Sequence, residues 1–216
     1  FGNVQNPTTA NQTFYARIST FSAANWTSPV DTGVVAASTA SQITVNMTVD
    51  ESLSFCAGTS ITGQNCGTIS GSTVSLPSGS ASSTSTGTSV MAAATNAQSG
   101  YAISVNGSTL TSGVNTIAAL SSQTASSTGS AQFGLNLRSN SSPSVGSEPT
   151  GTGSGTYNAN YGTANQFRFV TGDTVASAGG ATNGNTFTVS YIANITASQP
   201  AGTYSSVLTY ICTPTF

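Results

Sequence analysis

Apolar and polar residues alternate along many short stretches of this 216-residue chain, which is the period-2 pattern of β-strands with one buried face. The first such stretch is residues 13–21, where Phe14, Ala16 and Ile18 fall on one face. Residues 22–33, rich in Ser, Ala and turn formers, follow it and read as a loop. We therefore expect an N-terminal strand without a hairpin partner beside it.

The same alternation recurs through the rest of the chain. After the alternating residues 101–105, Asn106-Gly107 is a strong signal for a tight hairpin turn of type I′. Residues 41–49 carry an apolar residue at every second position, from Ile43 to Val49. Further strands are predicted at residues 52–55, 72–77, 131–139, 165–170, 185–196 and 202–216.

About nine such strands, separated by Gly, Ser and Pro and without a convincing helix, indicate an all-β fold. We predict an Ig-like, Greek-key β-sandwich with an N-terminal strand arm. The arm would comprise residues 1–22 and a single sandwich domain would comprise residues 23–216. A Gly/Ser-rich stretch near residues 139–165 is long for a connection inside a domain and is expected to be either a surface excursion or a flexible tip.

Charge is scarce in this chain. Only 4% of the residues are charged, the net charge is −2, and there is neither Lys nor His. Three scattered arginines cannot form the basic stripe that nucleic acids require. Without His or Lys, most general-base and nucleophile-activation schemes have no participants, so we expect no enzyme, no catalytic residue, no metal site and no cofactor. No apolar stretch reaches the ~18 residues of a membrane span.

An uncharged surface of Ser, Thr, Asn and Gly favours an extracellular or cell-surface location, reached through a signal or pro-segment that is removed. The three cysteines fit that compartment. Cys56 and Cys66 flank a short polar loop and are the favoured disulfide pair, Cys56 with Cys212 is the competitor, and three free thiols remain open.

A family resemblance covers nearly the whole chain. It is carried by TVDESLSFCAGTSITGQNCG, SGYAISVNGSTLTSGVNTI, QFGLNL, FRFVTGDTV and VSYIANITASQPAGTYSSVLTYICTPTF. These stretches resemble secreted surface proteins of candidate-phyla bacteria (Patescibacteria), a resemblance that implies surface location but no activity. The last stretch more weakly resembles the closing strand of spore-coat-U-type and archaic chaperone–usher pilins. That similarity implies an incomplete sandwich completed by a strand from the next subunit.

The N-terminal strand then has three possible fates. It pairs within its own sandwich, it inserts into another copy through Phe14, Ala16 and Ile18, or it is a loose arm. Insertion into another copy makes a head-to-tail contact that does not close on itself and so builds a filament.

Two functions follow from these alternatives. The first is a structural subunit of an extracellular pilus-like filament, a homopolymer assembled by donor-strand complementation between identical subunits. The second is a monomeric adhesin or glycan-binding module on the cell surface, in which Trp26, Tyr157 and Tyr161 would stack on sugar rings.

Overall fold

The computed structural model describes residue 5, residues 7–63 and residues 66–216 of the chain. Residues 1–4 and 6, which belong to the predicted arm, and residues 64–65, between the paired cysteines, lie outside the described residues. The chain divides into two compact units, Phe1–Val49 and Asp50–Phe216. This division falls 27 residues beyond the predicted boundary at residue 22, because the N-terminal strand has a partner that the sequence pattern missed.

The regular elements are almost all strands, as the alternating pattern predicted. Their bounds are β1 Thr13–Phe21, β2 Pro29–Ser38, β3 Leu53–Gly58, β4 Ser60–Thr62, β5 Thr68–Ser70, β6 Ser85–Thr95, β7 Tyr101–Gly107, β8 Thr111–Ser112, β9 Asn115–Thr116, β10 Thr124–Ala125, β11 Gln132–Asn136, β12 Asn140–Ser141, β13 Ser144–Val145, β14 Thr150–Gly151, β15 Thr156–Tyr157, the 3-10 turn η1 Ala159–Tyr161, β16 Gln166–Phe167, β17 Thr174–Ala178, β18 Thr182–Asn194 and β19 Leu208–Pro214. The all-β prediction is therefore confirmed.

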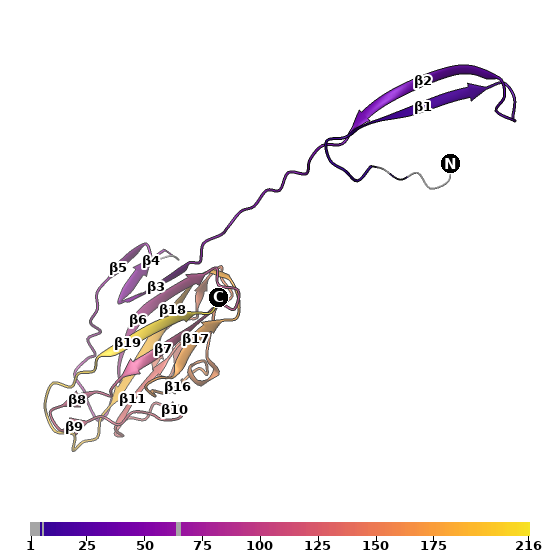
Figure 1. Ribbon diagram of the computed structural model, residues 1–216. Helices are drawn as coiled ribbons and strands as arrows, with labels where there is room; N and C mark the ends of the chain where they lie inside the picture. The colour runs from indigo at the N-terminus through magenta and orange to yellow at the C-terminus, as the bar shows by residue number, and fades with distance from the viewer. Residues whose placement is uncertain (1–4, 6, 64–65) are drawn as a thin grey trace. The chain divides into compact units, whose positions relative to one another are not determined.

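The first unit is a two-stranded antiparallel hairpin of β1 and β2 (Figure 1). Its register pairs Phe14 with Ala37 and Ile18 with Gly33, so the apolar face of β1 continues across β2. The prediction that residues 22–33 are a loop is wrong from Pro29 onward. Asp31 and Gly33, which resemble turn residues in isolation, sit inside a strand because the ladder to β1 satisfies their backbone.

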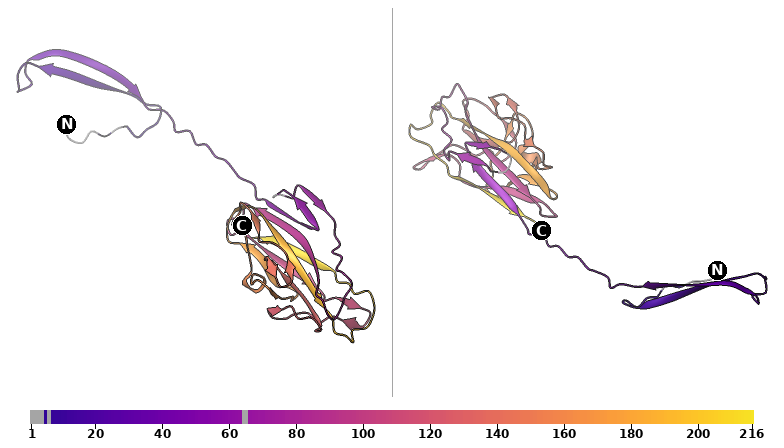
Figure 2. Two further views of the ribbon diagram at one scale, coloured as in Figure 1. Left: turned by 180° about the vertical axis from the view of Figure 1, so that it is seen from behind. Right: turned by 90° about the horizontal axis from the view of Figure 1, so that it is seen from above.

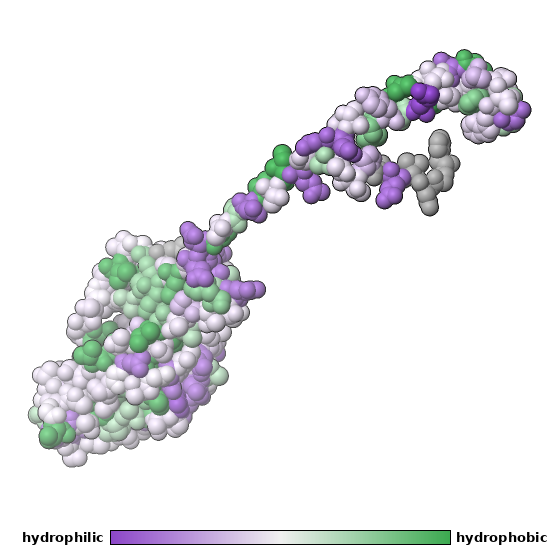
Figure 3. Space-filling model, viewed as in Figure 1, coloured by the Kyte–Doolittle hydropathy of each residue, from purple (hydrophilic) through white to green (hydrophobic). Residues whose placement is uncertain are grey.

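Residues 39–52, all of them described, contain no strand or helix. The predicted strand at residues 41–49 is therefore wrong for this structure, although the alternating pattern is perfect. Ile43 and Val45 are almost fully exposed. Figure 3 shows hydrophobic residues spaced along this stretch on the molecular surface.

Two antiparallel sheets enclose the core of the second unit (Figures 1 and 2). One sheet has the order β11-β18-β6-β3, with β14 also paired to β18. The other has the order β15-β17-β7-β19. β18 is the longest strand and pairs with β6 over most of its length, from Thr182↔Thr95 to Ala193↔Ser85. The inward residues of both sheets, such as Phe187, Val189, Ile103 and Val105, are completely buried.

The strand order differs from that of an immunoglobulin constant domain, whose sheets read ABED and CFG. Lettering the seven long strands of the second unit in chain order (β3, β6, β7, β11, β17, β18, β19) gives the sheets A-B-F-D and G-C-E. The fifth and sixth strands have therefore exchanged sheets relative to that order. The coarser β-sandwich prediction holds, and the immunoglobulin order does not.

Two local predictions in the second unit are corrected. The turn predicted at Asn106-Gly107 does not form, because both residues stay in β7 and pair with β19 through Gly107↔Leu208. The chain turns later, at Gly113 between β8 and β9, where φ is 59°. Residues 72–77 are extended but belong to no strand.

The Gly/Ser-rich stretch at residues 139–165 is more ordered than a free excursion. Three short strand pairings and the turn η1 hold it to the sandwich. Arg138 donates to the Glu148 carboxylate at 3.1 Å and lies over the Tyr157 ring. Asn140 donates to the carbonyls of Arg138 and Val145. Asn and Arg side chains thus replace a sheet ladder in this region.

Candidate functional site

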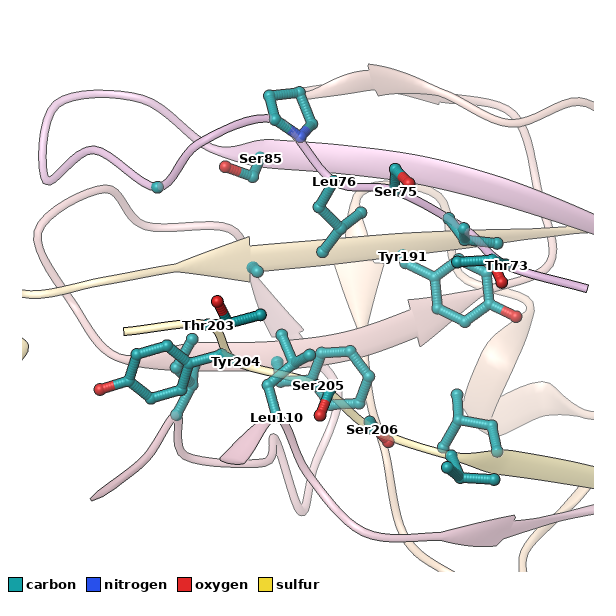
Figure 4. Close-up of a pocket in the computed structure, with 18 of the residues that line it drawn as sticks. Thr73, Ser75, Leu76, Ser85, Leu110, Tyr191, Thr203, Tyr204, Ser205 and Ser206 are labelled. Carbon is teal, nitrogen blue, oxygen red and sulfur yellow. The ribbon is translucent and has the colours of Figure 1, made fainter. Parts of the chain in front are cut away.

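An apolar groove of about 1150 Å³ opens in the second unit (Figure 4). Residues of both sheets line it, and so do two extended segments that form its rims, residues 72–79 and 199–207. Its apolar lining residues include Val74, Leu76, Leu110, Ile117, Phe133, Ala193, Ile195 and Leu208. None of the described lining residues is charged.

The first rim lies where β6 has lost a strand partner. β3 pairs with β6 only from Leu53↔Thr95 to Gly58↔Val90. In the N-terminal half of β6, residues 85–89 pair with β18 and with no other described strand. Residues 72–79 cover this open edge loosely and make no hydrogen bond to a described residue.

Side-chain packing, and not a ladder of backbone hydrogen bonds, holds residues 72–79 against β6. A methyl group on Gly87 would lie 2.6 Å from a Val74 carbon and 2.8 Å from a Leu76 carbon, so both apolar side chains rest on the bare backbone of β6. In Figure 4, Leu76 reaches into the groove from one side, and Thr203–Ser206 border the opposite side. The backbone amides and carbonyls of residues 72–79 consequently have no intramolecular partner within the described chain.

The opposite rim leads into β19, which is a sheet edge. β19 pairs with β7 from Leu208↔Gly107 to Pro214↔Tyr101, and no described strand pairs with its other side. Leu208, Tyr210 and Cys212 point inward but remain half-buried, as the alternation at residues 202–216 predicted. An edge strand with a half-covered apolar face can accept a further strand.

A short chain of hydroxyl groups crosses the floor of the groove. The Ser89 hydroxyl lies 2.7 Å from the Tyr191 hydroxyl, which lies 2.9 Å from that of Tyr210. This chain links β6 and β18 of one sheet to β19 of the other. Burial raises the pKa of both tyrosines above the ordinary value of 10, so the chain is uncharged at neutral pH.

The predicted donor residues lie outside this groove, on the hairpin of the first unit. Phe14 and Ile18 are 36% and 64% exposed, and Ala16 is exposed between them. Their face continues across Val35 and Ala37 of β2. A two-stranded ribbon with one apolar face uncovered has marginal stability in water, so this face is a candidate for contact with another surface.

The three aromatic residues predicted to bind glycans lie in two different units and differ in exposure. Trp26 is 75% exposed at the hairpin turn, with its ring edge-to-face against Phe21. Tyr157 is half-buried in the second unit under the Arg138 guanidinium. Tyr161 is completely buried and donates a 3.0 Å hydrogen bond to Asp173, so its prediction as an exposed sugar platform is corrected.

Cys56 and Cys66 form a disulfide, as the favoured reading predicted. Cys212 is a half-buried free thiol in β19, and its burial raises the pKa to about 11. The competing Cys56–Cys212 pair is therefore wrong. The bond ties Cys56 of β3 to Cys66 in the connection between β4 and β5.

Two carboxylates of the second unit are used in the fold. Glu148 pairs with Arg138, and Asp173 pairs with Arg168 at 2.9 Å and accepts from Tyr161. The described residues include no group of three or more His, Cys, Asp or Glu side chains that could hold a metal ion. In the part of the chain that the structure covers, no helix is long and apolar enough to cross a membrane.

No family model, curated protein or solved structure matches this chain. The pattern of apolar and polar residues does not predict the groove. Its one local signal is Gly87, a residue without a side chain in the middle of an otherwise regular strand.

Proposed function

We propose that this protein is a structural subunit of an extracellular filament, in which each copy is joined to the next by a strand inserted into the groove of the second unit. The observation that carries the proposal is the groove itself. It is uncharged and apolar, and strand edges with unpaired backbone groups border it on both sides. Such a site is suited to an extended peptide, whose main chain completes the ladder while alternate side chains fill the cavity.

The remainder of the molecule supports this proposal. The first unit presents exposed apolar residues on paired strands, including Ile18 and Val35 of the hairpin. Identical subunits with so few charges also stack without repeated like-charge repulsion. A disulfide and the absence of a membrane-spanning helix from the described residues are compatible with the extracellular location.

A glycan-binding module has less support. The aromatic residues that would form a sugar platform are distributed over two units, and one of them is completely buried. The groove has polar groups on its rims, but no exposed aromatic cluster among its described lining residues.

Electron microscopy and light scattering of the full chain over a range of concentrations test the proposal. We expect filaments, or a mass that grows with concentration. Ala193→Phe, which places a ring in the groove, should stop this growth, because Ala193 faces the cavity next to Tyr191 and Ile195. Ser130→Phe, on an exposed turn outside the groove, is the matched control and should assemble normally.

The far-ultraviolet spectrum and thermal unfolding would show that both variants are folded. A full chain that stays monomeric at every concentration would overturn the proposal. So would a folded Ala193→Phe variant that assembles like the unmodified protein.

A further inference from the structure

Residues 42–49 have the properties of a strand without a sheet. Ile43, Val45, Met47 and Val49 are 89%, 88%, 85% and 69% exposed, and polar residues occupy every position between them. Residues 42–49 make no hydrogen bond to any described residue. Four large apolar side chains in strict alternation, with both backbone edges unpaired, are an unusual feature of a protein surface.

We propose that residues 42–49 are the donor strand, and that they occupy the groove of a second copy of this chain. This inference rests on the proposed filament function, and it names the segment that makes the joint. In place of residues 13–21, the inserted residues would be Ile43, Val45, Met47 and Val49, with Thr44, Asn46 and Thr48 facing outward.

The competing strand, β1, already has a hydrogen-bonded partner along one of its two edges. Its nine residues pair with β2, with one register shift between Thr20 and Phe21, so one of its two edges is occupied. A groove bordered by rims on both sides takes a single strand with two free edges more readily than a hairpin. Residues 42–49 meet that requirement and β1 does not.

The dimensions of the segment and the groove also agree. Seven residues from Ile43 to Val49 extend about 20–24 Å, and their apolar side chains recur about every 6.8 Å. The open edge of β6 is five residues long, and residues 199–207 with Leu208 and Tyr210 of β19 line the facing side. Neither residues 41–49 nor the groove lining carries a charge, so no unpaired charge is buried in the joint.

The anchor of the segment places its partner groove in another molecule. Asn96 accepts from the Ser52 amide at 2.8 Å and donates to the Asp50 carbonyl at 2.7 Å. This holds the chain beside the end of β6 that is farthest from the groove, where β3 occupies the edge of β6 down to Val90.

A segment folded back from Asp50 has seven residues, about 24 Å, to reach Ile43. The same distance along β6 runs from Asn96 to about Ser89, where the groove only begins. Val45, Met47 and Val49 therefore cannot fill their own groove, whereas a second copy imposes no such limit.

The test uses the full chain and a pair of charge substitutions one residue apart. Val45→Asp places a carboxylate on the inserted face, and Asn46→Asp places the same charge on the outward face. We expect Val45→Asp to raise the apparent dissociation constant of a joint by about a hundredfold or more, measured by light scattering. Asn46→Asp should assemble like the unmodified chain.

Ile18→Asp separates this inference from the sequence-based donor. We expect filaments to persist in Ile18→Asp and to disappear in Val45→Asp. Both sites are exposed in the single chain, so both variants should fold and unfold like the unmodified protein.

A peptide of residues 41–50, SQITVNMTVD, provides a direct binding measurement. Labelled with a fluorophore, it should bind the Val45→Asp variant, whose groove stays empty, and in excess it should stop the growth of the unmodified chain. The peptide of residues 12–21, QTFYARISTF, is the comparison and should do neither.

The outcomes distinguish the two proposals. If the unmodified chain assembles and Val45→Asp assembles equally well, the inference about residues 42–49 is overturned while the filament function stands. Loss of assembly in Ile18→Asp alone would assign the joint to β1. If the unmodified chain never assembles and binds neither peptide, the filament function fails with it.

Discussion

The two units of this chain use the same strand chemistry with opposite results. In the second unit, alternate residues of β18 and β7 are almost completely buried, and the two sheets share one core. In the first unit, β1 and β2 are equally regular, yet nearly all their residues are exposed. The difference teaches that a strand pattern specifies a face to be buried, but not the surface that buries it. The first unit carries apolar faces that no other strand of that unit covers.

The largest contrast is expected in core truncation. Phe187→Ala removes a completely buried ring from β18 and should lower the free energy of unfolding by about 3–5 kcal/mol. Urea unfolding followed by tyrosine fluorescence measures this change. A loss below 1 kcal/mol would show that the second unit is not the densely packed body described here.

Removal of the disulfide should cause the second-largest loss in the free energy of unfolding. Replacing both Cys56 and Cys66 by Ser opens a ring between residues ten apart and should cost about 2–3 kcal/mol. The same urea titration applies, with reduced and oxidised unmodified protein as the control. Reduction that leaves the midpoint unchanged would mean that this ring does not support the sandwich.

Alkaline pH should lower the stability of the second unit by a smaller amount than these substitutions. Burial raises the pKa of Cys212 from 9.0 to about 11, and that of Tyr101 from 10.0 to about 12. A raised pKa means that the folded state holds its proton more tightly than the unfolded state does. This contribution is complete below the unfolded pKa and is lost as pH rises to the folded one.

Stability of the second unit should therefore decline between pH 9 and pH 12. In Cys212→Ser the decline should begin about one pH unit later, because only the tyrosines then titrate. Urea midpoints at pH 8 to 11.5 measure both curves. Identical curves would show that Cys212 does not contribute to the decline.

The smallest effect is expected in the hairpin. Ile18→Ala should change the free energy of unfolding of the isolated subunit by less than about 0.5 kcal/mol, because the side chain contacts little. The matched comparison is Phe187→Ala under the same conditions. A large destabilisation by Ile18→Ala in monomeric protein would mean that the hairpin face is already covered within the chain.

Sequence alone predicted the strands whose burial is decided locally. The alternation at Phe187–Ala193 and at Leu208–Cys212 is confirmed, and so is the Cys56–Cys66 bond, because short-range spacing determines each of them. The turn at Asn106-Gly107 was wrong because pairing with β19 overrides the turn preference.

The groove and the loss of residues 41–49 from the sandwich could not be predicted. The groove depends on where β3 stops pairing with β6, and Gly87 is its one local signal in the sequence. The same alternation that indicates a core strand at Ile43–Val49 also fits a strand meant for another molecule. Composition does not distinguish the two.

The Asn96 anchor has a mechanical consequence. Tension applied to the N-terminal segment enters the second unit at Asp50 and Ser52, where Asn96 holds the chain beside β6. It then loads the ladder of β3 with β6 along the strand axis, so six residue pairs resist together instead of opening one at a time. If β3 detaches from β6, the Cys56–Cys66 bond prevents the residues between the two cysteines from extending. The force then passes through the bond to the segment after β4. The region where the chain leaves the sandwich is thus built to carry a pulling force.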